Sequence, residues 1–233
     1  MPNELYGFSF DIFSDYAHFR HVFTQSFFET LLAPSKTVAT GLLAATLGLG
    51  EKEAIGLNDE LSIGVEVLKI GGFASEITTA LNLKSGSIER TPTLRNLLIS
   101  PKYRLYVACK DKTLLDKLHK AVNEPAYPLY LGISECLAEV ANISPPKKLR
   151  PVKETDFQCL VPSNGKEYNY KLTQPRLRVV LPRVFKTVSS YIYTPKGRKP
   201  LNYIDLIMFY NCMLKFKEPI KAFKFEGKNV CLF

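Results

Sequence analysis

The order in which strand and helix patterns follow one another restricts the fold of this chain most. Apolar residues alternate with polar or small ones at Tyr6–Ile12, Leu61–Val67 and Tyr103–Cys109, which predicts three strands, the first of them half-buried. A fourth strand is expected either at Leu129–Leu131 or within Leu137–Ile143. Each strand is short, so the chain must bury its apolar faces by combining them in one sheet.

Two stretches with helical spacing separate these strands. The first begins at Pro34 with Ser35 as its N-cap, ends at Gly48 and Gly50, and carries the apolar stripe Val38, Leu42 and Ala45. The second is capped by Asp111 or Thr113 and carries the stripe Leu114, Leu118 and Val122. The resulting order, strand–helix–strand–strand–helix–strand, predicts an α+β domain of ferredoxin-like plan over residues 1–146.

A long insertion lies between the second and third strands, at about residues 76–101. It contains Lys84, Arg90 and Arg95 together with small and polar residues. Loops of this length inside a compact domain are usually functional or disordered. We therefore expect the insertion to carry part of the function.

The run Pro145–Pro151 is rich in proline and lysine and predicts a domain boundary after residue 146. Beyond it, Asn164-Gly165 predicts a hairpin between Phe157–Val161 and Lys166–Leu172. Turns are expected at Pro195-Lys196-Gly197 and Glu226-Gly227. Residues 147–233 therefore predict a small β-rich domain, with one helix near Tyr203–Leu214.

Charge is unevenly distributed along the chain. Residues 1–75 hold four Lys/Arg and nine Asp/Glu, a net −5, whereas residues 76–233 hold 27 and 13, a net +14. A basic surface on one side is expected of a protein that binds a phosphate backbone. A solvated basic face without a partner is the alternative that composition leaves open.

Ser35-Lys36-Thr37 resembles the end of a phosphate-binding P-loop, but the glycines of that loop are missing before Lys36. An ATPase is therefore excluded. A helix N-terminus still offers free N–H groups and a positive dipole end, which Lys36 and Thr37 supplement with a cation and a hydroxyl. The competing interpretation is an ordinary capped core helix, in which Gly41 permits close packing on the sheet or on another chain.

Arg20 is one of the few basic residues in the acidic first third of the chain. It follows the aromatic residues Tyr16 and Phe19, and an arginine beside rings suits a phosphate contact combined with stacking on a base. An ion pair with Asp15 or Glu29 is an equally good account of Arg20.

Other chemistries lack their residues. The three histidines, His18, His21 and His119, form no metal-binding motif, and the five cysteines form no C-x-x-C pair, so we expect neither a metal nor a cofactor. The amino end is not a signal peptide, and the most apolar window, Tyr203–Leu214, is too short to span a bilayer. We therefore expect a cytoplasmic protein that does not contact a membrane.

Several of these segments together resemble the Cas-five (Cas5) family, whose members are RAMP-superfamily subunits of type I CRISPR Cascade complexes. The resemblance is carried by Ala17–Arg20 with Thr24, Pro34–Gly48, Asn96–Tyr103, Pro128–Glu135 and the closing Phe225–Phe233. It covers most of the first 135 residues and little of Lys147–Tyr210. The type I-B or I-A versions are the most similar.

The resemblance implies an RRM-like, ferredoxin-like RAMP domain whose insertion at 76–101 forms a protruding thumb. It implies a non-catalytic subunit that caps the 5′ handle of the crRNA beside the Cascade backbone and large subunits and supports target DNA interference indirectly. Single-stranded RNA is usually held by phosphate contacts and stacked bases. The candidate RNA-binding residues are Arg20, Ser35, Lys36, Thr37, Lys84, Arg90, Arg95, Lys102 and Arg104.

Two points limit what the resemblance implies. The chain lacks the aromatic RNP1 pattern of ordinary RNA-recognition motifs, so stacking across the sheet is not assumed. One branch of the family, in type I-C systems, cleaves the guide precursor without a metal. The residues that could serve such a metal-independent endoribonuclease here are Tyr16, His18, His119 and Lys117, and none aligns with that branch's active site.

Overall fold

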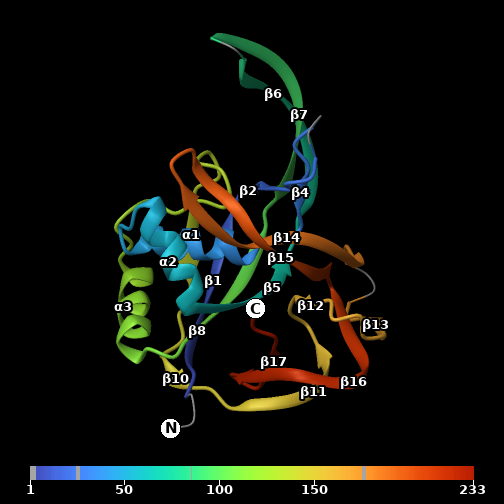
Figure 1. Cartoon of the computed structure of the whole chain (residues 1–233). Helices are drawn as coiled ribbons and strands as arrows, with labels where there is room; N and C mark the ends of the chain where they lie inside the picture. Colours follow the sequence, from blue (N-terminus) through green and yellow to red (C-terminus); the bar gives the residue numbers. More distant parts are fainter. Residues whose placement is uncertain (1–3, 25–26, 85, 175–176) are drawn as a thin grey trace.

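The computed structural model describes residues 4–24, 27–84, 86–174 and 177–233. The protein is a strand-rich α/β structure in which helices cover one face of a central sheet, carboxyl-terminal strands cover the other, and one carboxyl-terminal hairpin also packs against the helices (Figure 1). The central sheet is formed by β1 (Tyr6–Ser14), β5 (Leu61–Lys69), β8 (Lys102–Cys109), β9 (Ala138–Ala141) and β10 (Lys147–Lys148). The helices are α1 (Lys36–Thr46), α2 (Glu51–Glu60) and α3 (Lys112–Asn123).

The three sequence-predicted strands are adjacent in this sheet. β8 lies between β1 and β5 and is antiparallel to both, so that Val107 faces Phe8 on one side and Ile63 on the other. β9 pairs with the free edge of β1 next to β10. The fourth strand therefore lies in the second of the two segments expected for it, whereas Tyr130 contributes only an isolated bridge to Leu137.

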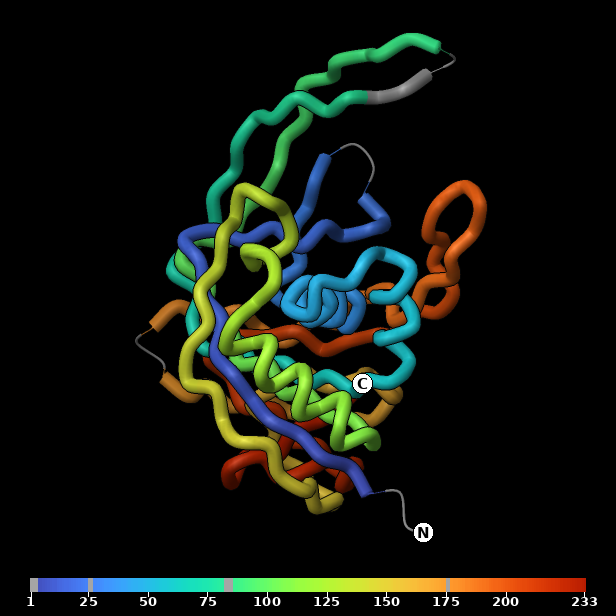
Figure 2. The backbone as a smooth tube through the Cα atoms, turned by 90° about the vertical axis from the view of Figure 1, so that its left-hand side faces the viewer, coloured from blue at the N-terminus to red at the C-terminus, as the bar shows by residue number. Residues whose placement is uncertain are grey.

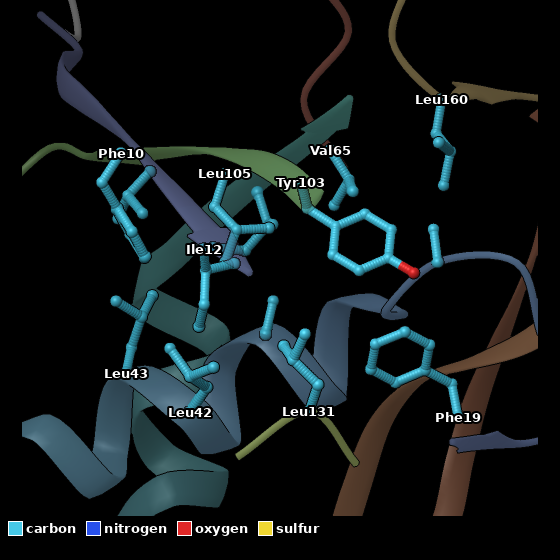
Figure 3. Close-up of a cluster of buried hydrophobic side chains, with 14 of the residues drawn as sticks. Phe10, Ile12, Phe19, Leu42, Leu43, Val65, Tyr103, Leu105, Leu131 and Leu160 are labelled. Carbon is cyan, nitrogen blue, oxygen red and sulfur yellow. The ribbon is translucent and has the colours of Figure 1, made fainter. Parts of the chain in front are cut away.

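The helices bury their apolar sides against one face of the sheet. Phe10, Ile12 and Leu105 point from β1 and β8 toward Leu42 and Leu43 of α1 (Figure 3). Burial of a large aliphatic or aromatic side chain contributes about 1.5–3 kcal/mol, so this cluster is a main source of stability. The tube view shows α3 alongside β1, and the predicted cap Asp111 accepts hydrogen bonds from the amides of Thr113 and Leu114 (Figure 2).

The opposite face of the sheet is also covered, which the alternation in β1 did not indicate. Ser9 and Asp11 are 1% exposed, as deeply buried as the apolar residues between them. Residues of the carboxyl-terminal strands pack on this face, for example Phe225, whose ring centre lies 5.0 Å from that of Tyr106. The expectation of a half-buried first strand is therefore wrong.

The helix expected at Pro34–Gly48 forms as α1 with Ser35 at its N-cap. A second helix, α2, follows at a place where the sequence predicted only the end of the first helix, at Gly48 and Gly50, and then a strand. Gly50 has no side chain to cap α2, but its amide donates to Oε2 of Glu53 at 2.9 Å. This glutamate three residues after the cap was the signal for the missed helix.

The insertion is a hairpin of two long strands, β6 (Gly72–Lys84) and β7 (Ser87–Ile99), paired in register from Gly72↔Ile99 to Lys84↔Ser87. Both views show it projecting from the body of the molecule (Figures 1 and 2). Near its base it pairs with β2 (Tyr16–Ala17), while β3 (Phe19–Arg20) pairs with β4 (Thr30–Leu31).

All the regular elements described after residue 150 are strands. The elements are β11 (Pro151–Phe157), β12 (Val161–Pro162), β13 (Tyr168–Leu172), β14 (Val180–Thr194), β15 (Gly197–Tyr210), β16 (Cys212–Phe225) and β17 (Lys228–Val230). The helix expected near Tyr203–Leu214 is wrong, because this stretch runs through β15 and β16. Long-range pairing with β14, β11 and β13 outweighs its local pattern.

The three predicted turns have different outcomes in the structure. Gly197 and Gly227 occupy left-handed backbone conformations, with φ of 99° and 86°, between β14 and β15 and between β16 and β17. The chain bends at Gly165, where φ is 71°, but the hairpin predicted around Asn164-Gly165 is wrong. The flanking strands belong to different sheets, since β12 pairs with β15 and β13 pairs with β16. The predicted boundary between residues 146 and 147 stays a prediction.

Candidate functional site

A cleft of about 400 Å³ opens where the chain segment around β3, the start of α1 and the β14–β15 hairpin meet. We call it the basic cleft. Its polar and aromatic lining residues are His18, Phe19, Arg20, Phe28, Ser35, Thr37, Arg95, Lys186, Thr187, Tyr191 and Arg198. Four of the nine candidate residues, Arg20, Ser35, Thr37 and Arg95, are therefore brought together from three separate segments.

Arg20 lies on one wall of the basic cleft. β3 holds it opposite Thr30 of β4, and its guanidinium carbon lies 4.6 Å from the centre of the Phe28 ring. Glu29, one of the acids considered as its partner, instead approaches Nδ1 of His21 at 3.2 Å. Arg20 is exposed and stacked on a ring, which leaves the edge of its guanidinium available for a phosphate and its outer face available for a base.

The start of α1 forms the floor. Ser35 occupies the N-cap position, but its side chain makes no capping bond and instead lies 3.2 Å from the hydroxyl of Thr37. The first turn contains no acidic residue, so the positive end of the helix dipole is not neutralised by the helix itself. This end of α1 therefore favours an anion.

Lys36 does not line the basic cleft with its two neighbours. It is half-buried, and burial lowers the pKa of its ammonium group, an effect that the charge of Asp59 opposes. Lys36 therefore lies toward α2, the helix that carries Asp59. The structure thus separates the cation of the Ser35-Lys36-Thr37 motif from its two hydroxyls.

His18 lies at the back of the basic cleft and is 3% exposed. Its Nδ1 is 2.8 Å from the carbonyl oxygen of Asn96, which can only accept, so Nδ1 carries the proton and Nε2 does not. Burial, with the nearby charges of Arg95 and Arg20, lowers the pKa of His18. The neutral imidazole is thus the form present at pH 7.

The loop after α3 closes the cleft behind His18. The amide of His18 donates to the carbonyl of Leu131 at 3.1 Å, and Gly132 adopts a φ of 93°. A Cβ atom on Gly132 would lie 2.7 Å from the carbonyl carbon of His18 and closer still to its oxygen. Only glycine therefore allows the loop to pass this close to the strand.

The opposite wall comes from β14 and β15, which the sequence reading did not assign to the site. Lys186 and Tyr191 lie on β14, and Arg198 lies on β15 with its guanidinium carbon 5.2 Å from the Tyr191 ring centre. Arg198 also approaches Glu51 of α2 at 3.4 Å. The interleaving of Lys and Arg with tyrosines over residues 186–198 was the available signal for this wall.

Arg95 lines the cleft, but its charge is already paired. One of its terminal nitrogens lies 2.5 Å from Oε1 of Glu76, and another lies 3.8 Å from Glu135. Its side chain is only 17% exposed. The ion pair with Glu76 therefore joins β7 to β6 within the hairpin, only the longer contact reaches the loop after α3, and the net positive field of Arg95 in the cleft is small.

Lys102 and Arg104 lie on the other face of the sheet, away from the basic cleft. Both contact the buried carboxylate of Asp11, at 3.2 Å and 2.7 Å, and Nδ2 of Asn142 donates to Oδ2 of the same carboxylate at 2.8 Å. Burial by itself raises the pKa of Asp11, but the hydrogen bonds from Arg104 and Asn142 outweigh it and lower the pKa overall. This network has a structural role.

The last two candidates lie on the β6–β7 hairpin. Arg90 is exposed on β7 opposite Leu81. Lys84 is the final residue of β6, and its side chain lies outside the described residues. Arg90 does not line the basic cleft.

Two further observations concern the described ranges only. No three His, Cys, Asp or Glu side chains in them are placed to hold a metal ion. None of the helices in them is long and apolar enough to cross a membrane.

Comparison with known proteins identifies the family. The model of the family described as CRISPR-associated protein (Cas_Cas5) matches residues 8–204, well over half of the chain. The chain belongs to the Cas5 family. This agrees with the resemblance carried by Pro34–Gly48 and its flanking motifs, and extends it into the residues after 147. No curated protein sequence matched this Cas5 chain.

Two solved structures have a similar fold over most of the chain. "CRISPR RNA-guided surveillance complex" contains a chain that is 14% identical to this Cas5 protein, covers 91% of each chain and has a TM-score of 0.55. "Crystal structure of a CRISPR protein from Archaeoglobus fulgidus" is 14% identical over 97% of this chain and 98% of its own, with a TM-score of 0.54. A third, "Crystal structure of Cas protein", is 23% identical, but the match spans only 55% of this chain and 57% of its own, with a TM-score of 0.40.

Proposed function

We propose that this Cas5 protein is a non-catalytic subunit of a type I CRISPR surveillance complex, Cascade, and that it binds the 5′ handle of the crRNA. The observation that carries the proposal is the basic cleft. There Arg20 on Phe28, the uncapped start of α1, Lys186 and Arg198 face one space. Cations beside rings combine phosphate contacts with base stacking, the usual way in which single-stranded RNA is held.

The architecture supports the same proposal. We infer a ferredoxin-like sheet, the plan implied for a RAMP protein, and the strand order β9–β1–β8–β5 with α1 and α3 in the two crossovers supports this inference. We infer that the projecting β6–β7 hairpin is the thumb and that residues 147–233 are the small β-rich domain. In Cascade the partners are the backbone and large subunits, and target DNA is engaged indirectly.

The proposal that the protein does not cut RNA rests on the positions of the candidate groups. Cleavage through a 2′-hydroxyl needs a base and an acid near one phosphate. Of the four candidates, only His18 lines the basic cleft. His119 packs its ring edge-on against Phe8, with centres 5.3 Å apart.

The test measures binding of a fluorescein-labelled, single-stranded handle RNA to the full chain by fluorescence anisotropy. We expect the double variant Arg20→Ala/Lys186→Ala to bind at least tenfold more weakly. The slope of log affinity against log salt should fall by about 1.4, because two phosphate contacts are lost from a single strand. The matched control is Lys110→Ala/Lys120→Ala, which removes the same charge from exposed positions around α3 and should change affinity less than twofold.

Equal losses in the two double variants would contradict the assignment of the cleft. The absence of catalysis is tested separately by incubating the isolated protein with repeat RNA in EDTA. A discrete cleavage product that disappears in His18→Ala would establish the endoribonuclease instead.

A further inference from the structure

A second basic surface lies on the outer face of the sheet formed by β11, β16 and β13. In β16 the even-numbered residues Leu214, Phe216, Ile220 and Ala222 are buried, whereas the odd-numbered Lys215, Lys217 and Lys221 are exposed. The strand therefore turns one side to the core and the other to solvent. β11 and β16 lie at the end of the molecule opposite the free end of the β6–β7 hairpin (Figure 1).

The strand register places two more lysines on this outer side. Lys153 of β11 is directly opposite Lys221, and Lys171 of β13 is opposite Met213, which shares its side of β16 with Lys215. We call Lys153, Lys171, Lys215, Lys217 and Lys221 the lysine face. Lys217 pairs with Glu167. The other four form no ion pair within the described ranges, and all four are exposed.

The pair Lys153 and Lys221 is informative because like charges directly opposite on neighbouring antiparallel strands repel each other. The free protein gains nothing from this arrangement, whereas an anion placed across both strands would stabilise it. Lys215 lies six residues from Lys221 along β16, but the strand bulges between them. Their partners on β11, Asp156 and Lys153, are only three residues apart, about 10 Å at the usual rise of a strand. The cations thus extend along the sheet rather than surrounding one small ion.

The rest of the outer face distinguishes between classes of polyanion. No large hydrophobic side chain of β11 or β16 is among the exposed ones, and the ring of Phe223 lies 5.6 Å from the ammonium group of Lys221. Protein interfaces are depleted in lysine and enriched in exposed aromatic residues. Single-strand binders need free rings for stacking. Contact with the backbone of a duplex needs only cations on an extended surface.

We propose that the lysine face binds the phosphate backbone of a double-stranded nucleic acid, independently of base sequence. The site does not depend on the basic cleft, which lies among α1, β3 and the β14–β15 hairpin and is suited to a single strand. One chain could therefore hold a single strand and a duplex at once.

The test uses the full chain and three fluorescein-labelled probes of arbitrary sequence: a DNA duplex, an RNA duplex and a single-stranded RNA. Binding is followed by fluorescence anisotropy over a series of salt concentrations. The triple variant Lys153→Gln/Lys215→Gln/Lys221→Gln should bind both duplexes at least tenfold more weakly. Its salt slope should fall by about 2 to 3, since three phosphate contacts are lost. Its affinity for the single strand should stay within twofold of the wild type.

Two further variants separate a site from bulk charge and from misfolding. Lys52→Gln/Lys110→Gln/Lys120→Gln removes the same charge from exposed positions elsewhere and should leave duplex binding within twofold of the wild type. Lys153→Arg/Lys215→Arg/Lys221→Arg keeps the charge and should keep duplex binding. Equal losses in the two glutamine triples, an equal loss for the single strand, or displacement of the duplex by polyglutamate at equal charge concentration would each overturn the proposal.

Discussion

Replacement of Gly132 by alanine tests how the loop after α3 is held against His18. Gly132 has a φ of 93°, a region that side chains rarely adopt, and its missing Cβ would meet the carbonyl group of His18 at under 3.0 Å. The loop cannot simply retreat, because Leu131 accepts a hydrogen bond from the amide of His18 at 3.1 Å and donates one to Cys136 at 2.9 Å. Alanine must therefore change the backbone, break one of these bonds, or do both.

The magnitude follows from these two contributions. A positive φ costs a residue with a Cβ roughly 1–2 kcal/mol. Loss of one backbone hydrogen bond at a buried position costs about 1–2 kcal/mol more. We therefore expect Gly132→Ala to lower the free energy of unfolding by about 3 kcal/mol, or the melting temperature by about 6–12 °C for a chain of this size.

Gly41→Ala is the matched control. The sequence left open that Gly41 permits close packing on the sheet or on another chain. The structure contradicts packing on the sheet, since Gly41 is exposed and nothing lies within 4 Å of a Cβ placed there; approach by another chain stays a prediction. Alanine in a helix interior is favoured over glycine by about 0.5–1 kcal/mol, so this variant should be slightly more stable than the wild type. Both are measured by urea denaturation followed by circular dichroism. A Gly132→Ala protein within 0.5 kcal/mol of the wild type, or less destabilised than Gly41→Ala, would refute the reasoning.

Two predictions concern buried titratable groups. Because burial lowers the pKa of folded His18, the unfolded chain takes up a proton first as pH falls below about 6.5, and the free energy of unfolding should decline there by up to about 1.4 kcal/mol per pH unit. Urea titrations of the wild type and His18→Gln from pH 7.5 to 5 should show that the variant lacks this decline. Parallel stability profiles of the two proteins would contradict the prediction. The lowered pKa of Asp11 means that its ionised form adds stability above about pH 3.9, which is lost as pH falls through the folded value. Arg104→Met should accordingly lower the free energy of unfolding by about 2–3 kcal/mol at pH 7, a value discounted because the Arg104 side chain is 23% exposed. The difference in stability from the wild type, measured by urea titration, should shrink in acid. A difference that does not depend on pH would assign the loss to packing alone.

Local patterns in the sequence were sufficient for the elements of the first half and for part of the candidate site. The strand around Phe8 and Phe10, the N-cap positions of Ser35 and Asp111, and the turn at Gly227 depend on neighbours a few residues away. Each lies where it was expected, although the strand is buried on both faces and Ser35 makes no capping bond with its side chain. The same motifs carried the resemblance to the Cas5 family, and they placed Arg20, Ser35 and Thr37 among the candidates that line the basic cleft.

Only the tertiary structure decided which charges remain free and which segments meet. Arg95 forms an ion pair with Glu76, and Lys102 and Arg104 form ion pairs with Asp11, so three cations selected from the sequence are paired within the chain. Lys186 and Arg198 line the cleft because β14 and β15 pack against α1 and α2, which lie far earlier in the sequence. The hydrogen bond from the Asn58 side chain to the carbonyl of Ser189, for example, joins residues more than 130 positions apart. The alternation of residues along β16 is visible in the sequence, but the position of Lys153 opposite Lys221 is set by register. Periodicity is a local property of the chain, whereas ion pairing and register depend on contacts between distant segments, and those contacts exist only once the chain has folded.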